Sequence, residues 1–204
     1  MTAAYRQSED AILEMARRTG MIRALEIRKA GHHPEYLRRL CRDGRLIRTG
    51  RGLYALPDST ITQHHSLAEA CKRVPHGIVC LLSALSYHDV GTQNPHEVWM
   101  TIDRAKRKPK VDYPPIRTFR SSGPALIEGV DEIEIEGVPV RIYNPAKTVA
   151  DCFKYRNKVG MDVAIEALRE GWRAKLLTVD ELVQHARICR VLKVMQPYME
   201  AIVS

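Results

Sequence analysis

Apolar side chains recur at helical spacing near the start of this 204-residue chain. Residues 8–19 (SEDAILEMARRT) carry them behind Ser8, which predicts a helix with that serine as its N-cap. Residues 21–30 (MIRALEIRKA) predict a second, short helix that ends at Gly31.

The next stretch predicts a third helix with two different faces. It begins near Pro34, since proline is favoured in a first helical turn, and ends at Gly44. The apolar face consists of Tyr36, Leu37, Leu40 and Cys41. The polar face consists of Glu35, Arg38, Arg39 and Arg42, at positions i, i+3, i+4 and i+7. One face is therefore expected in a core, and the other presents guanidinium groups along one line.

Two short strands are expected after this helix, at residues 45–49 (RLIRT) and 52–56 (GLYAL), with TGRG as the turn. The alternation in the first strand is imperfect, because Leu46 and Arg48 share a parity. The order of three helices and a hairpin is that of a winged helix-turn-helix. We therefore predict a DNA-binding domain over residues 1–60.

The remaining residues, 61–204, mix strand-like and helix-like patterns, so the fold class is α/β (α+β), with a mixed α/β second domain that ends in a helical segment. Strands are expected at 97–103 and 116–120 and a hairpin at 131–143. Helices are expected at 66–73, where Ser66 and Glu69 suggest a capping box, and at 145–155, 161–172 and 178–190, with Pro197 interrupting or kinking the last segment. Glu132, Glu134 and Glu136 are expected to share a solvent-facing side of the hairpin.

Charge narrows the choice of partners. The formal net charge is +8, and residues 23–52 contain nine Lys or Arg against three acids, a local net charge of +6. A polyanion is therefore expected as partner, either nucleic acid or an anionic membrane surface. No apolar run is long enough for a membrane span, and the N-terminus has no apolar signal segment, so we expect a cytoplasmic protein without membrane association. The five scattered cysteines are expected to be reduced.

The coincidence of charge and helix order favours double-stranded DNA. A major groove accepts an α-helix, and guanine edges suit arginine forks. The candidate DNA-binding residues are His33, Glu35, Tyr36, Arg38, Arg39, Arg42, Arg45, Arg48 and Arg51. The alternative is a solvated helix face beside an ordinary basic hairpin. A second basic run, residues 104–110, either extends a DNA footprint, meets a partner or is a solvated loop.

Catalytic patterns are absent from the sequence. There is no P-loop, GxGxxG or HExxH, and the histidines and cysteines lack zinc spacing. We expect no enzyme activity, no metal and no cofactor. A nuclease site made of Asp103 with Lys106, or of Glu97 with Asp103, is an alternative, although neither spacing is diagnostic.

Two stretches resemble one protein family. Residues 28–57 (RKAGHHPEYLRRLCRDGRLIRTGRGLYALP) resemble the N-terminal winged helix of AbiEi-type antitoxins of bacterial type IV toxin–antitoxin systems, with a helix of the form LxRLxxxG and a wing ending GxYxLP. Residues 143–172 (YNPAKTVADCFKYRNKVGMDVAIEALREGW) resemble the C-terminal antitoxin region of that family.

The resemblance implies a protein with two tasks. Its first domain would repress its own operon by binding inverted repeats in the promoter, and its second would add cooperativity through self-association on DNA. The second domain would also counteract a nucleotidyltransferase-type toxin, without necessarily forming a stable complex. Lys147, Thr148 and Asp151 match the antitoxin motif, although they also suit a helix start packed on a sheet. The other function that stays open is a stand-alone winged-helix regulator whose second domain senses a ligand or dimerises.

Overall fold

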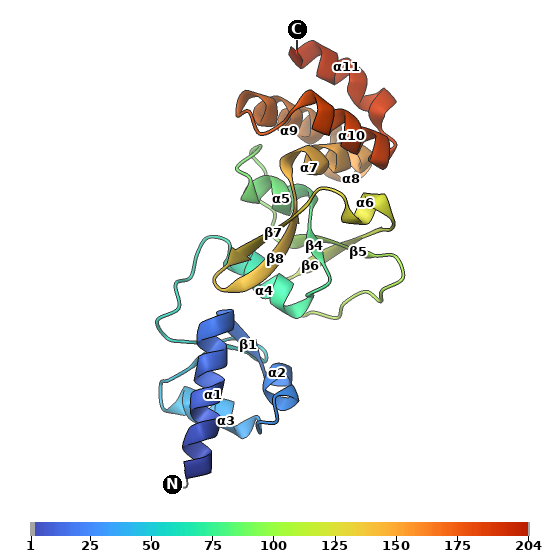
Figure 1. Cartoon of the computed structure of the whole chain (residues 1–204). Helices are drawn as coiled ribbons and strands as arrows, with labels where there is room; N and C mark the ends of the chain where they lie inside the picture. The colour runs from blue at the N-terminus through green and yellow to red at the C-terminus, as the bar shows by residue number, and fades with distance from the viewer. Residues whose placement is uncertain (1–2, 204) are drawn as a thin grey trace. The chain divides into compact units, whose positions relative to one another are not determined.

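The computed structural model describes residues 3–203, and its internal contacts divide the chain into two units (Figure 1). The first unit comprises Met1–Arg73 together with Glu134–Pro139. The second comprises Val74–Ile133 and Val140–Ser204. The boundary predicted at residue 60 stays a proposal about how function divides along the chain.

The first unit contains four helices and a three-stranded sheet among its described residues. Its elements are α1 (Ala3–Thr19), β1 (Met21–Arg23), α2 (Ala24–Lys29), α3 (Glu35–Arg42), β2 (Ile47–Gly50), β3 (Leu53–Ala55) and α4 (His65–Arg73). The sheet is antiparallel in the order β1-β3-β2, and its register pairs Met21 with Ala55 and Arg48 with Tyr54. The three helices and the hairpin of a winged helix-turn-helix are therefore present, with one additional strand.

That additional strand corrects two predictions. Residues 21–23 form β1 rather than the start of a helix, because Met21 and Ile22 are 2% and 1% exposed and pair with β3. Gly20, with φ of +63°, turns the chain between α1 and β1. Ser8 is not an N-cap, since α1 already begins at Ala3.

The core of the first unit explains why α3 has two faces. Leu37 and Leu40 are 1% and 0% exposed, and they pack in one cluster with Ile12, Leu13, Ala16, Ile22, Ile27 and Leu46. The predicted apolar face of this helix is confirmed, although Tyr36 and Cys41 are only partly buried.

The helix predicted at 66–73 exists, but its capping box is wrong. Ser66 lies inside α4, which begins at His65. Glu69 is buried, at 1% exposure, and its carboxylate pairs with Arg73 at 2.8 Å instead of capping the helix.

The second unit places helices on a five-stranded sheet of order β6-β5-β4-β8-β7. Its strands are β4 (Ile78–Val79), β5 (Val98–Asp103), β6 (Ile116–Ser121), β7 (Val130–Ile135) and β8 (Val138–Tyr143). Its helices are α5 (Leu81–Tyr87), α6 (Pro124–Ile127), α7 (Pro145–Lys154), α8 (Arg156–Val159), α9 (Met161–Arg173), α10 (Val179–Cys189) and α11 (Leu192–Val203). Figure 1 shows α7 to α11 gathered on one side of this sheet. The mixed α/β class and the helical end are confirmed.

The helix starts in the second unit follow local chemistry. The Asn144 side chain accepts a hydrogen bond from the Lys147 backbone N–H at 2.8 Å, and Thr178 with Glu181 forms the predicted capping box. Pro197 does not interrupt α11. A proline removes one backbone donor, and burial of Met195 and Met199 on either side, at 0% and 7% exposure, keeps the helix packed.

The predicted acidic face is only partly correct. Glu132 and Glu134 are exposed on β7. Glu136 instead lies in the turn after β7, in the left-handed region at φ of 54°. Its carboxylate accepts hydrogen bonds from the Thr62 N–H at 2.7 Å and from the Thr62 hydroxyl at 3.0 Å, and it pairs with the His65 ring at 2.7 Å.

Among the described residues, no helix combines the length and apolarity needed to cross a bilayer.

Candidate nucleic-acid interface

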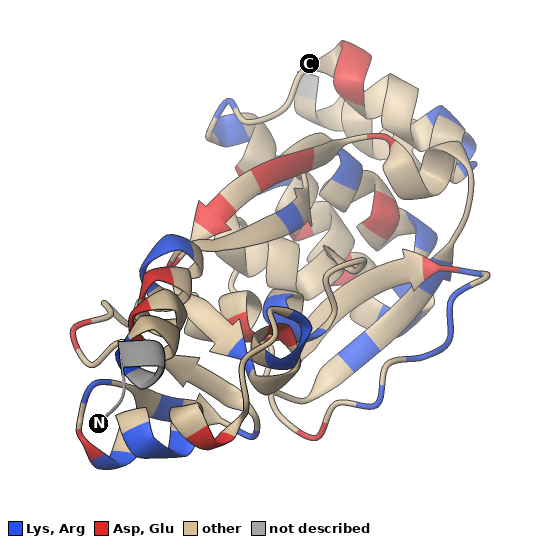
Figure 2. Ribbon diagram, turned by 60° about the horizontal axis from the view of Figure 1, so that its bottom comes forward, with Lys and Arg blue, Asp and Glu red and all other residues tan. Residues whose placement is uncertain are grey.

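The outer face of α3 carries two well-exposed basic groups. The Arg38 side chain is 85% exposed and the Arg42 side chain is 74% exposed. Arg38 lies 4.0 Å from Glu35, and Arg42 lies 3.3 Å from Asp43. Exposed pairs of this kind contribute little free energy, so both guanidinium groups can exchange these partners for a phosphate or a base. In Figure 2 this short helix lies below the N-terminus and is largely blue.

The first turn of α3 is organised by His33. The Glu35 N–H donates to Nδ1 of His33 at 3.2 Å, which leaves Nε2 as the ring nitrogen that carries the proton in the neutral form. His33 and Arg38 also line an open depression of about 610 Å³ with Arg28 at the end of α2. Arg28 was not among the predicted site residues.

Tyr36 and Arg39 are less exposed than Arg38 and Arg42 on the same helix. Tyr36 packs against the core of the first unit, and both side chains are half-buried. Together with His33 and Glu35 they line a smaller depression of about 340 Å³. Arg39 is therefore less accessible to a partner than Arg38 or Arg42.

Arg45 differs from the other predicted arginines. Its guanidinium group contacts two carboxylates of α1, Glu9 at 3.1 Å and Asp10 at 3.4 Å. The Glu9 side chain is only 14% exposed, so this contact is partly shielded from water. Arg45 thus ties the loop after α3 to α1 through two ion pairs.

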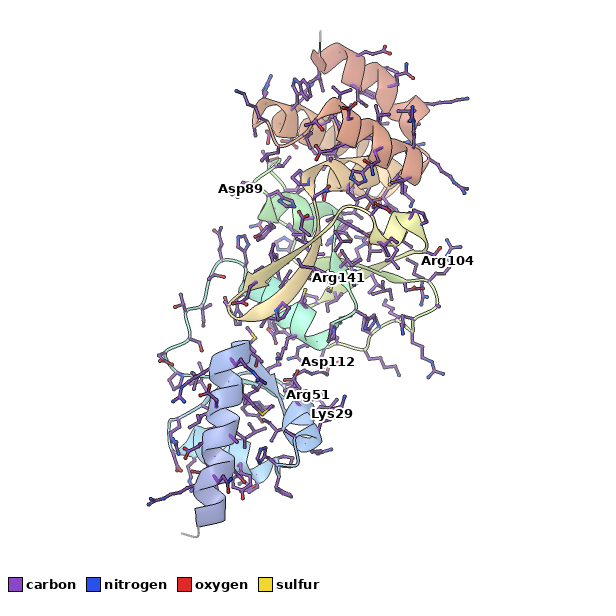
Figure 3. The ribbon with its side chains drawn as sticks, viewed as in Figure 1. Lys29, Arg51, Asp89, Arg104, Asp112 and Arg141 are labelled. Atoms are coloured by element: carbon purple, nitrogen blue, oxygen red, sulfur yellow. The ribbon has the colours of Figure 1, made fainter. Side chains whose placement is uncertain are left out.

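The wing is the hairpin of β2 and β3. Its turn uses Gly52, at φ of +71°, and the strand pairing shifts by a bulge between Arg48 and Gly50. The Arg48 side chain is exposed and donates from Nε to the Gly50 carbonyl at 3.2 Å. Arg51 is also exposed and is labelled in Figure 3.

The backbone of the wing is held by the Glu69–Arg73 pair of α4, which we call the wing clamp. Arg73 donates from one guanidinium nitrogen to the Arg51 carbonyl at 3.0 Å and from another to Glu69 at 2.8 Å. A Cβ added at Gly50 would lie 2.5 Å from the Glu69 carboxylate, so the wing backbone approaches the clamp closely. The sequence offered one signal for this contact, the i,i+4 spacing of an acid and an arginine.

The three residues predicted to match the antitoxin motif lie in the interior of the second unit. Lys147 and Thr148 are 0% exposed and Asp151 is 4% exposed. The Lys147 ammonium pairs with Asp151 and lies 3.9 Å from the centroid of the Tyr143 ring. Thr148 donates to the Tyr143 carbonyl at 3.1 Å. The structure thus brings the three residues together as a packed polar cluster.

Two groups of α10 complete this cluster. The Cys189 thiol donates to Asp151 at 3.2 Å, and burial raises its pKa to about 12. His185 packs near Lys147, and burial followed by the Lys147 charge lowers its pKa. Both groups are therefore neutral at physiological pH.

The two acidic residues of the nuclease alternative have different hydrogen-bond partners. Glu97 accepts a hydrogen bond from Arg117 at 3.3 Å, and Asp103 accepts one from the Ala105 N–H at 2.8 Å. Within residues 3–203 there is no group of three or more His, Cys, Asp or Glu side chains that could hold a metal ion. Residues 104–110 form the exposed connection after β5, at the right of Figure 2.

Comparison with known proteins supports the reading of the first unit. Residues 10–57 match the family model described as "Transcriptional regulator, AbiEi antitoxin". The match confirms the resemblance seen in residues 28–57 and includes most of α1. It leaves residues 143–172 outside, so their resemblance stays a prediction.

The fold also has a relative among solved structures. The crystal structure of the RV2827C protein from Mycobacterium tuberculosis is similar with a TM-score of 0.57 at 14% sequence identity, covering 95% of this chain and 72% of that chain. Similarity at this identity concerns the fold alone. No curated protein sequence matches the chain.

Proposed function

We propose, from the match of residues 10–57 to AbiEi antitoxin regulators, that this chain is a DNA-binding antitoxin that represses its own operon. Its winged helix would bind inverted repeats in the promoter, and the chain would counteract a nucleotidyltransferase-type toxin. Both tasks belong to the cytoplasm, and neither requires a cofactor or a catalytic group of this chain.

The observation that carries the DNA-binding proposal is the exposed arginine row on a helix whose other side is buried. Arg38 and Arg42 are four residues apart, about 6 Å along the helix axis, so both can enter one major groove. Arg48 and Arg51 on the wing would contact phosphates beside that groove. Glu35, Tyr36, Arg39 and His33 flank the row and would set its orientation, whereas Arg45 would act mainly through its contacts with α1.

The proposal predicts a strong dependence on salt, because phosphate contacts release counterions. Each phosphate contact should contribute about 0.9 to the slope of log K against log salt. Loss of one wing arginine should therefore lower the slope by about 1 and weaken all sequences equally. Loss of an arginine that reads a base should instead cost about 1–3 kcal/mol on the operator alone.

The experiment is fluorescence anisotropy with the full chain and two duplexes, the promoter of its own operon and a shuffled sequence. Arg38→Ala should lose affinity for the promoter selectively, and Arg48→Ala should weaken both duplexes equally. Arg17→Ala is the matched control, since this arginine is also exposed and ion-paired but lies on α1. The proposal fails if the Arg38→Ala and Arg48→Ala chains bind both duplexes as the unchanged chain does.

For the antitoxin task, we propose that Lys147, Thr148 and Asp151 act by holding the second unit in its folded form. Because they are buried, they would not touch the toxin themselves. This agrees with antagonism that needs no stable complex. Co-expression of the full chain with a neighbouring nucleotidyltransferase gene tests this task, and growth that stays arrested would refute it.

A second candidate is a stand-alone regulator whose second unit senses a ligand. It is favoured by a basic cleft in that unit, between the ends of β6 and α10. A regulator of this kind would bind promoter DNA but would not restore growth in the co-expression experiment.

A further inference from the structure

The second unit contains a cleft of about 680 Å³ that the DNA-binding proposal does not use. It lies where several elements end: Arg104 after β5, Arg120 and Ser121 at the end of β6, Lys154 and Tyr155 at the end of α7, and Arg187 and Arg190 at the end of α10. Figure 3 labels Arg104, which lies near α6. A volume of this size is within the range of sites for small molecules.

All the charged residues that line the cleft are basic. Five basic side chains contribute to it, from Arg104, Arg120, Lys154, Arg187 and Arg190, and no acidic residue does. Within residues 3–203, none of these five forms an ion pair. Below the cleft, the Cys189 thiol donates to Asp151, whose carboxylate is already paired with Lys147. The positive charge is therefore not compensated from within, and a concave wall concentrates its field.

Two of the arginines have distinctive local structure. Arg120 donates from one guanidinium nitrogen to the carbonyls of Arg104 at 2.6 Å and Lys106 at 3.0 Å, which holds the start of the basic loop against β6. Arg190 has left-handed backbone angles, φ of 59° and ψ of 38°, at a C-cap position where glycine is usual. A side chain retained in this strained conformation is a reason to look for a function. Helix dipoles favour cations at Arg187 and Arg190, at the end of α10, and at Lys154, in the last turn of α7, but they do not account for Arg104 and Arg120.

The remaining groups of the lining suit a ligand with neutral polar and aromatic parts. Ser121 and Ser122 offer hydroxyl groups. The Tyr155 ring contacts Phe119 edge-on, with centroids 5.0 Å apart. Burial raises the pKa of Tyr155 to about 12, so its hydroxyl stays a hydrogen-bond donor at neutral pH. An aromatic ring beside basic side chains can support a nucleobase as well as a phosphate.

We propose that this cleft binds a nucleoside triphosphate. The basic side chains would hold the phosphates, and Tyr155 would contact the base. Because the lining contains no carboxylate that could hold Mg²⁺, binding would not need the metal. The site would bind the nucleotide without hydrolysing it.

The test is isothermal titration of the full chain with ATP and with GTP, in the presence of EDTA. One nucleotide should bind per chain. Arg187→Ala should weaken binding about tenfold, since a charge-assisted hydrogen bond is lost. Arg190→Gly should weaken it similarly and at the same time raise the midpoint of thermal unfolding, because glycine suits the left-handed backbone. This second variant separates loss of the site from loss of the fold. Arg169→Ala, an exposed arginine on α9 away from the cleft, is the matched control.

Several outcomes would overturn the proposal. One is no heat of binding with either nucleotide, and another is binding that Arg187→Ala and Arg190→Gly leave unchanged. Inorganic tripolyphosphate that binds as tightly as ATP would show that the nucleoside is not recognised. A single-stranded oligonucleotide that binds through Arg187 and is not displaced by ATP would assign the cleft to nucleic acid. The Arg38→Ala chain should bind ATP normally. Promoter binding and nucleotide binding can therefore fail independently, and the two proposals are tested separately.

Discussion

Replacement of Lys147 by methionine tests whether the antitoxin-like motif works through the fold. The ammonium is fully buried and its partner Asp151 has a side chain only 5% exposed. Lys147→Met has a similar volume but leaves the Asp151 carboxylate in the interior with the Cys189 thiol as its remaining hydrogen-bond donor. Removal of one partner from a buried pair typically costs about 3–5 kcal/mol, because the other charge stays desolvated. This is a large part of the stability of an ordinary domain.

The expected result is a lower midpoint of thermal unfolding, measured by circular dichroism. For a chain of this size 1 kcal/mol corresponds to about 2–4 °C, so a fall of about 10 °C is expected. The double variant Lys147→Met/Asp151→Leu should recover most of the loss, because no charge is then left unpaired. Lys158→Met, on the exposed surface of α8, should change the midpoint little. A Lys147→Met chain as stable as the unchanged one, yet unable to restore growth beside the toxin, would refute a structural role.

Three further predictions concern stability and thiol chemistry. Gly20→Ala should destabilise the chain by more than about 3 kcal/mol in urea unfolding, because the added Cβ would lie 1.6 Å from the Glu136 carbonyl oxygen. Gly44→Ala is the control, also at positive φ but with open space around it, and should cost only about 1 kcal/mol. Equal losses in the two variants would contradict the close contact at Gly20. Thr178→Ala should cost about 1 kcal/mol by removing a helix cap, and an unchanged urea midpoint would speak against the capping box. Iodoacetamide should label Cys41 before the four buried cysteines. The labelling rate should still increase above pH 9, because partial burial raises the pKa of the Cys41 thiol from 9.0. Mass spectrometry that finds another cysteine labelled first would contradict this order.

Local chemistry predicted most of the first unit. The spacing of Leu37 and Leu40 against Arg38 and Arg42 was sufficient to place one side of α3 in a core and the other outside. The same reasoning failed at Met21, because a short apolar segment fits a helix or a strand equally well until its partner is known. That partner, β3, lies about thirty residues further along the chain.

Contacts between distant residues were beyond reach of the sequence. The acid of an apparent capping box, Glu69, is instead half of the clamp beneath the wing, and only the folded chain shows that Arg73 reaches the Arg51 carbonyl. The basic cleft was missed for a related reason. Its cations belong to segments as far apart as Arg104 and Arg187, and no local pattern connects them.

The division of the first unit between two stretches of chain has a consequence for its biosynthesis. Glu134–Pro139 belongs to this unit, and Gly20 lies against the backbone of that late segment. A ribosome releases the N-terminal helices first, yet their neighbours at residues 134–139 emerge only about sixty residues after Arg73. The winged helix therefore cannot complete its packing until residues 134–139 have been synthesised. A chain truncated just after Arg73 would lack the contacts that this segment makes with the first unit.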